Sequence, residues 1–128
     1  MGVIVHPFRA AVEARDIDAA VALLADKVVF HSPIAFTPYE GRAAVAVVLR
    51  AVIEVFEDFT YVREIGAPDA VDHALVFRAN VGGRQVEGCD FLHRGDDGLI
   101  DEFTVMVRPL NGAMALAEAM KAKLAAGR

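Results

Sequence analysis

Cysteine is nearly absent from the sequence: Cys89 is the only one, and tryptophan is missing altogether. A single cysteine cannot form a disulfide within the chain or a cysteine-rich metal cluster, which excludes a disulfide framework and a zinc-finger-type domain. It agrees with a protein of the reducing cytoplasm, which is the location we expect. For the thiol itself we expect packing in the interior, as is usual for a free cysteine.

Basic residues are also scarce, with 13 Lys and Arg against 18 Asp and Glu, giving a net charge of -5. This balance disfavours a nucleic-acid partner or an anionic membrane surface. No uncharged apolar run approaches the ~18 residues that cross a bilayer. The first ten residues, MGVIVHPFRA, lack a basic leader before an apolar core, so we expect no signal peptide. Small molecules and other proteins remain as partners.

What the sequence does contain fits one domain over residues 1–128, with 55% hydrophobic residues and no low-complexity tract. Periodicity predicts four helices. Pro7 suits a first turn followed by Phe8, Ala11 and Val12, and Asp16 can cap a second helix containing Ile17, Val21 and Leu24. The third runs from Arg42 to Phe56. The fourth covers Leu110 to Leu124, with its apolar stripe at Leu110, Met114, Ala117, Met120 and Leu124.

Strands are predicted at Val28–His31, Phe59–Ile65 and Ala70–Val81, and the stretch Arg84–Leu110 reads as a long hairpin around Asp97-Gly98. The segment Ser32–Gly41 contains two prolines and a glycine, so we expect a loop that borders a cavity. Helices precede strands, which predicts an α+β class with a bent, mostly antiparallel sheet.

The hairpin alternates between two faces. Leu99, Asp101, Phe103, Val105 and Val107 are predicted to be buried on its second strand. On the first strand Asp90 shares a face with Val86, Gly88 and Leu92, unless Cys89 and Phe91 define the inner side. A carboxyl buried without a cationic partner resists ionisation, so we expect the pKa of Asp90 to rise by about one unit or more.

Two stretches carry a family resemblance. One is RDIDAAVALLADKVVFHSPIAFTPYEGRAAV, and the other is CDFLHRGDDGLIDEFTV with its D-G-x-I turn. In this order they resemble the nuclear-transport-factor-2-like superfamily, particularly its SnoaL-like and ketosteroid-isomerase-like branches. The resemblance implies a cone-shaped α+β barrel, in which a curved sheet wraps around N-terminal helices and leaves an apolar pocket. It also implies homodimers formed through the sheet, and the apolar Val76 and Met106 on the outer face agree.

The catalytic sets of the superfamily can be compared position by position. Ketosteroid isomerases have an aspartate base where this sequence has Ser32, and their tyrosine donor aligns with Phe8. Their second aspartate, a protonated donor, aligns with Asp90. Limonene epoxide hydrolase is similar in fold, but its arginine would fall at Gly88 and its second aspartate near Val105. Both sets are therefore incomplete, and the SnoaL-like polyketide cyclases share only a need for a pocket acid, which Asp90 could provide.

Two functions stay open. The first is a non-catalytic protein that binds a small hydrophobic molecule in a pocket with the single acid Asp90. The alternative is an isomerase, cyclase or hydrolase-type enzyme acting on a polyketide- or steroid-like substrate, with Asp90 as acid and Ser32 as auxiliary polar group. In either case we expect a pocket wall made by Phe8, Phe30, Leu92, Phe103, Val105 and Val107. No cofactor or metal is expected. His31, His73 and His93 are predicted to lie outward or on the surface.

Overall fold

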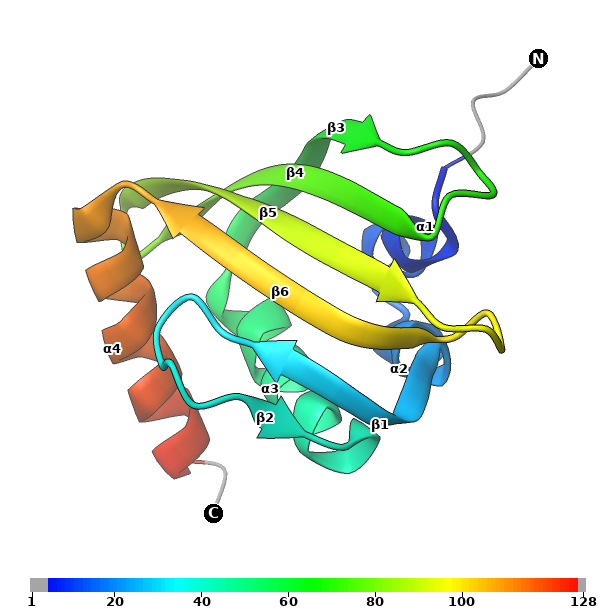
Figure 1. Cartoon of the computed structure of the whole chain (residues 1–128). Helices are drawn as coiled ribbons and strands as arrows, with labels where there is room; N and C mark the ends of the chain where they lie inside the picture. Colours follow the sequence, from blue (N-terminus) through cyan, green and yellow to red (C-terminus); the bar gives the residue numbers. More distant parts are fainter. Residues whose placement is uncertain (1–4, 127–128) are drawn as a thin grey trace.

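The computed structural model describes residues 5–126, in which a curved six-stranded sheet has helices behind it and at one end (Figure 1). The strands are β1 (Leu24–His31), β2 (Tyr39–Glu40), β3 (Glu57–Ile65), β4 (Asp72–Val81), β5 (Arg84–Arg94) and β6 (Ile100–Arg108). The helices are α1 (Pro7–Glu13), α2 (Ile17–Ala22), α3 (Arg42–Val55) and α4 (Leu110–Ala126). The absence of a signal peptide was predicted from the first ten residues. Residues 1–4 of that stretch lie outside the described residues.

The sheet has the order β2-β1-β6-β5-β4-β3, and every neighbouring pair is antiparallel except β1 with β6. This confirms the predicted α+β class with a curved, mostly antiparallel sheet against N-terminal helices. The sheet does not close on itself, because β2 and β3 remain as its two edges. The helices complete the cone behind it. That the whole chain is a single domain stays a prediction. No helix among residues 5–126 is long and apolar enough to cross a membrane.

The helix starts follow from local capping. The His6 ring nitrogen accepts a hydrogen bond from the Phe8 amide at 3.0 Å, with Pro7 in the first turn. Asp16 caps α2 as predicted, through its carboxylate and the Ala19 amide at 3.0 Å. The prediction for Leu24 was wrong, because this residue begins β1 rather than ending a helix. It pairs with Ile100 on β6, and this parallel pairing outweighs the helical spacing.

The burial pattern of β6 differs from simple alternation near the hairpin turn. Ile100 is buried and Asp101 half-buried, whereas Leu99 and Asp101 were predicted to share the inner face. The cause is a register shift, in which His93 pairs with Glu102 but Arg94 pairs with Ile100. The extra residue, Asp101, is bulged, and a bulge reverses the alternation on one side of it. From Phe103 onward the predicted faces hold.

Helix α4 departs from its predicted stripe at the N-terminal end, whereas Ala117, Met120 and Leu124 of that stripe line the cavity. Leu110 and Met114 are 78% and 61% exposed, while Gly112 and Leu116 are buried. Gly112 lies against β5 so closely that a β-carbon there would be 2.6 Å from a Val86 methyl group. The close approach of the helix backbone to the sheet at Gly112 determines which side of this end of α4 is buried.

Aromatic rings fill the space between sheet and helices. Phe103 is packed edge-to-face by Phe8 of α1 at 5.2 Å and by Phe30 of β1 at 5.1 Å between ring centres. Further along, Phe77 stacks on Phe59 at 4.9 Å, and Gly88 leaves the room that the Phe77 ring occupies. Such pairs add to the burial of apolar area. These rings share the inner side of the sheet with Asp90 of β5.

Candidate functional site

A cavity of about 250 Å³ lies between the inner face of the sheet and the helices, lined mainly by aliphatic and aromatic side chains from α1, α2, α3, α4, the strands and the segment 32–35. Of the six residues predicted to form its wall, four line it: Phe8, Phe30, Phe103 and Val105. Phe8 and Phe103 are almost completely buried and form the floor. The cavity is therefore walled at this end by packed rings rather than by loops.

The other two predicted wall residues do not line the cavity. Leu92 shares the inner face of β5 with Asp90, but its side chain is buried in the hydrophobic core. Val107 is only partly buried and packs against the core near the end of β6. Both residues face the inner side of the sheet, as predicted. The inner face of the sheet, however, extends beyond the cavity.

Asp90 is 6% exposed, lies opposite Leu75 and Val105 in the sheet, and lines the cavity. The inner face of β5 is therefore the one that carries Asp90, and not the one that carries Cys89 and Phe91. Phe91 is exposed and Cys89 is only half-buried. The expectation of an interior Cys89 was wrong, since its strand position directs it to the outer face. Asp90 is the only carboxylate among the described residues that line the cavity.

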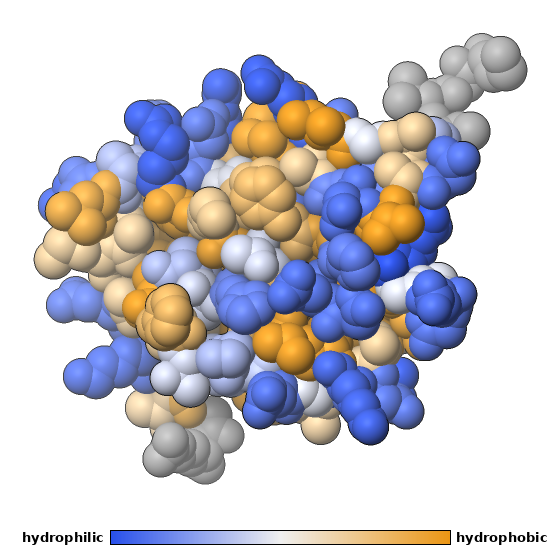
Figure 2. Space-filling view, in the orientation of Figure 1, coloured by the Kyte–Doolittle hydropathy of each residue, from blue (hydrophilic) through white to orange (hydrophobic). Residues whose placement is uncertain are grey.

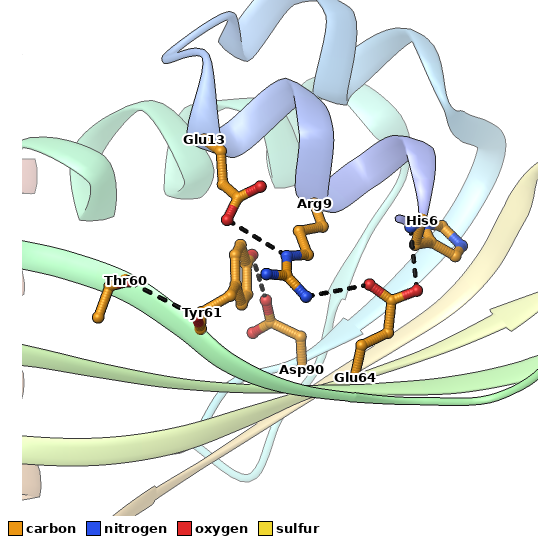
Figure 3. Close-up of polar contacts among 7 residues, drawn as sticks. All are labelled: His6, Arg9, Glu13, Thr60, Tyr61, Glu64 and Asp90. Atoms are coloured by element: carbon orange, nitrogen blue, oxygen red, sulfur yellow. Dashed lines mark hydrogen bonds and ion pairs between the residues drawn. The ribbon is translucent and has the colours of Figure 1, made fainter. Parts of the chain in front are cut away.

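Tyr61 of β3 is the partner that the sequence analysis missed. Its hydroxyl donates a hydrogen bond to Oδ2 of Asp90 at 2.8 Å, and the two side chains point toward each other across the inner face (Figure 3). Tyr61 is 5% exposed and also lines the cavity. The sequence pattern contained a clue to this contact. Phe59 and Tyr61 are two positions apart on a strand and so share one face, and a buried tyrosine hydroxyl needs a polar partner.

The two groups of this pair have shifted pKa values. Burial raises the pKa of the Asp90 carboxyl from 3.8 to about 7, while the hydrogen bond from Tyr61 acts in the opposite direction. The predicted rise is therefore found. Burial, followed by the negative charge of Asp90, raises the pKa of Tyr61 far above its ordinary value. Near neutral pH the tyrosine stays a donor, and the carboxyl exchanges between its two protonation states.

Helix α1 places Arg9 above this pair (Figure 3). The guanidinium lies 5.9 Å from the centre of the Tyr61 ring and is held by Glu13 at 3.2 Å and Glu64 at 3.4 Å. Glu64 also accepts a hydrogen bond from the His6 amide at 3.0 Å. These contacts attach the first helix to β3 directly over Tyr61. Arg9 does not line the cavity, so its effect on a ligand passes through the tyrosine.

Ser32 lines the cavity, but its hydroxyl oxygen is already engaged. It accepts hydrogen bonds from the amides of Ile34 at 2.9 Å and Ala35 at 3.0 Å. A hydroxyl has two lone pairs, so this oxygen has none left to accept a proton from a ligand. The auxiliary role predicted for Ser32 is thus restricted to donating its own hydrogen.

The histidines lie away from the cavity. His31 and His93 are on the outer face, His31 near Glu102 at 3.4 Å and His93 on Asp101 at 2.7 Å. The surface expectation for His73 was wrong: it is 5% exposed, and its Nε2 lies 2.8 Å from the Ala67 carbonyl oxygen. The β3–β4 loop folds over it. Within residues 5–126 no three His, Cys, Asp or Glu side chains are placed to hold a metal ion.

Comparison with known proteins gives a consistent assignment. Residues 5–103 match the family model of the SnoaL-like domain. No curated protein matches the chain. Among solved structures, a steroid delta-isomerase from Pseudomonas aeruginosa is 41% identical, with a TM-score of 0.87 over 92% of this chain and 86% of that one. An uncharacterized protein with a cystatin-like fold from Silicibacter pomeroyi DSS-3 is 36% identical, with a TM-score of 0.85 over 91% and 82%.

A more distant structure shares the fold. It comes from Mycobacterium tuberculosis and was solved in complex with estradiol-17beta-hemisuccinate; it is 20% identical, with a TM-score of 0.63 over 83% of this chain and 91% of that one. At this identity the likeness concerns the arrangement of the elements alone.

The raised pKa of Asp90 predicts a pH-dependent stability. The folded chain holds this proton more tightly than the unfolded chain, so unfolding becomes easier as pH rises from about 4 to about 7. The loss is at most ~1.4 kcal/mol per pH unit. Asp90→Asn stays neutral and still accepts the Tyr61 hydrogen bond. We expect it to exceed the wild type in free energy of unfolding by roughly 2–4 kcal/mol at pH 8 and to match it near pH 4.

Urea denaturation across this pH range measures the difference. Asp96→Asn, in the exposed hairpin turn, is the matched control and should follow the wild-type profile. An Asp90→Asn protein that is no more stable than wild type at pH 8 would show that the carboxyl ionises in the fold without cost.

Proposed function

Because the chain belongs to the SnoaL-like domain family, within the nuclear-transport-factor-2-like superfamily, and its apolar cavity contains one buried acid, we propose that it binds a small hydrophobic molecule bearing a carbonyl or hydroxyl group. The observation that carries the proposal is the Tyr61–Asp90 hydrogen bond in an otherwise apolar lining. Apolar contacts supply most of the affinity in such a pocket, and a few polar groups fix the orientation of the ligand.

The pair can serve either kind of polar group. When Asp90 is neutral, its acid hydrogen can be donated to a carbonyl oxygen of the ligand while Tyr61 remains bound to Oδ2. When Asp90 is ionised, the carboxylate can accept a hydrogen from a ligand hydroxyl. Because the pKa is about 7, both states are populated near neutral pH. Ligand selectivity should therefore shift from ketones toward alcohols and phenols as pH rises.

The second candidate is an enzyme of the isomerase, cyclase or hydrolase type that acts on a steroid- or polyketide-like substrate by proton transfer. Two observations favour it: a second polar group adjoins the acid, and a pKa of about 7 suits an acid-base catalyst at neutral pH. The 41% identity to a steroid delta-isomerase adds weight. Against it stands Ser32, whose hydroxyl cannot act as the missing base.

The binding function is tested with 2-naphthol and naphthalene, which share an apolar body and differ by one hydroxyl. Wild-type protein should prefer 2-naphthol, measured by fluorescence titration at pH 7. The double variant Tyr61→Phe/Asp90→Leu removes both polar groups of the pair and should reduce this preference by about fivefold, which corresponds to about one neutral hydrogen bond. Equal preference in the two proteins would show that the pair does not contact the ligand.

The catalytic alternative is tested by restoring a carboxylate at position 32. An aspartate can keep both amide hydrogen bonds of the 32–35 turn and still have lone pairs to accept a proton. We expect Ser32→Asp to isomerise 5-androstene-3,17-dione, followed by the absorbance of the conjugated product, about 100-fold or more faster than wild type. Ser32→Asn is the uncharged control. Rapid turnover by the wild type, lost in Asp90→Asn, would instead make Asp90 the base and the chain an isomerase.

We also propose that the chain pairs through the outer face of the sheet. Val76, Cys89 and Met106 lie side by side on β4, β5 and β6, next to the exposed Phe91. Figure 2 looks onto this face and shows apolar surface over the upper middle of the sheet, bordered by hydrophilic residues. A self-complementary apolar patch of this kind suits a two-fold dimer.

Replacing Met106, which is 59% exposed, by lysine should dissociate the dimer, because two like charges would meet across the two-fold axis. Val47 on α3 is 58% exposed, and Val47→Lys is the matched control. Sedimentation at micromolar concentration should give twice the chain mass of 13.7 kDa for wild type and Val47→Lys, and one chain mass for Met106→Lys. A monomeric wild type would contradict the pairing.

A further inference from the structure

The mouth of the cavity carries a charge that the proposed function does not use. Lys121 of α4 is the only cation among the described residues that line the cavity. It is exposed, as are Ile34 and Ala35 on the neighbouring loop, whereas Asp90 and Tyr61 are buried. The lining thus has a closed end with the acid pair and an open end with the lysine.

The ammonium group of Lys121 is available to a ligand. The nearby Lys123 is paired with Glu54 of α3 at 2.7 Å, but no ion pair or hydrogen bond among residues 5–126 involves Lys121. No carboxylate of the described lining other than Asp90 competes for it. The chain has a net charge of -5, yet within residues 5–126 the entrance of this apolar cavity carries an unpaired positive charge. Such a charge can bind an anionic group of a ligand.

Ser32 also lines the cavity, and its hydroxyl is a second donor of the lining. Because its oxygen already accepts two amide hydrogen bonds, the hydroxyl hydrogen is the only part of it free to interact with a ligand. At the open end the ammonium of Lys121 matches the charge of a carboxylate. A phosphate dianion usually draws on more donors or a planar arginine fork, and the described lining contains no arginine.

Cavity size fits a ligand that reaches the mouth. The volume of about 250 Å³ is below the ~300–1,000 Å³ of pockets that enclose a drug-sized molecule. A larger apolar body seated on Asp90 must therefore extend toward Lys121. We infer that the ligand is an amphipathic carboxylic acid, with its carbonyl or hydroxyl end on the Tyr61–Asp90 pair and its carboxylate beside Lys121. This inference rests on the proposed function.

The test uses 6-hydroxy-2-naphthoic acid and its methyl ester, which share the ring and hydroxyl and differ in the charge of the far end. Fluorescence titration at pH 7 and low salt should show the acid bound about three- to fivefold more tightly than the ester by wild-type protein, the size expected of a partly exposed ion pair. The ratio should fall toward one in 0.5 M NaCl, because salt screens the pair.

Lys121→Met keeps the length of the side chain and should bring the ratio to about one, and Lys121→Glu should bring it below one. Lys123→Met, on the same helix but outside the lining, should keep the wild-type ratio. A ratio of one in wild type, or one that survives in Lys121→Met, would overturn this inference while binding of both probes still supported the proposed function. If neither probe bound, the proposed function itself would fall, and the inference with it.

Discussion

The hydrogen bond between Tyr61 and Asp90 is the interaction on which the character of this cavity depends. A carboxyl group taken out of water without a cation resists ionisation, and here a single neutral donor stands where other proteins place an arginine or lysine. The tyrosine partly offsets the cost of burial and leaves the acid with a pKa of about 7. Removing the surrounding rings would let water in and return the acid to its usual behaviour. The packing of Phe8, Phe77 and Phe103 thus helps to keep the pKa of Asp90 raised.

The pair also links two strands of the sheet that are not hydrogen-bonded to each other. Tyr61 lies on the edge strand β3, Asp90 lies two strands away on β5, and Arg9 of α1 lies over the Tyr61 ring. The ion pairs of Arg9 with Glu13 and Glu64 hold the helix over the tyrosine ring. Helix position and tyrosine orientation are therefore coupled, so a change at the partly exposed Arg9 is felt at the buried acid through the ring between them.

Much of this arrangement could be predicted from the sequence, and the failures have physical causes. Asp90 was found because a strand alternates with period two and its same-face neighbours are apolar. Tyr61 was missed because its partner is 29 positions away, and pairing across an intervening strand leaves no local pattern. Asp101 was misplaced because a bulge has no reliable periodic signal. The stripe of α4 was misread only at Leu110 and Met114, because Gly112, with no side chain, determines which side of that end of the helix meets the sheet.

One consequence of the topology concerns how the protein is made. Strand β1 has its parallel partner in β6, the last strand of the chain, and their contact places Phe30 beside Phe103 at the cavity floor. Contacts between distant parts of a chain form late, because the intervening loop must first be closed. During synthesis the early helices and β1 must wait with apolar faces uncovered until β6 has left the ribosome. Assembly of the cavity is therefore nearly the last event in folding, and this interval is when a nascent chain of this design is most exposed to aggregation.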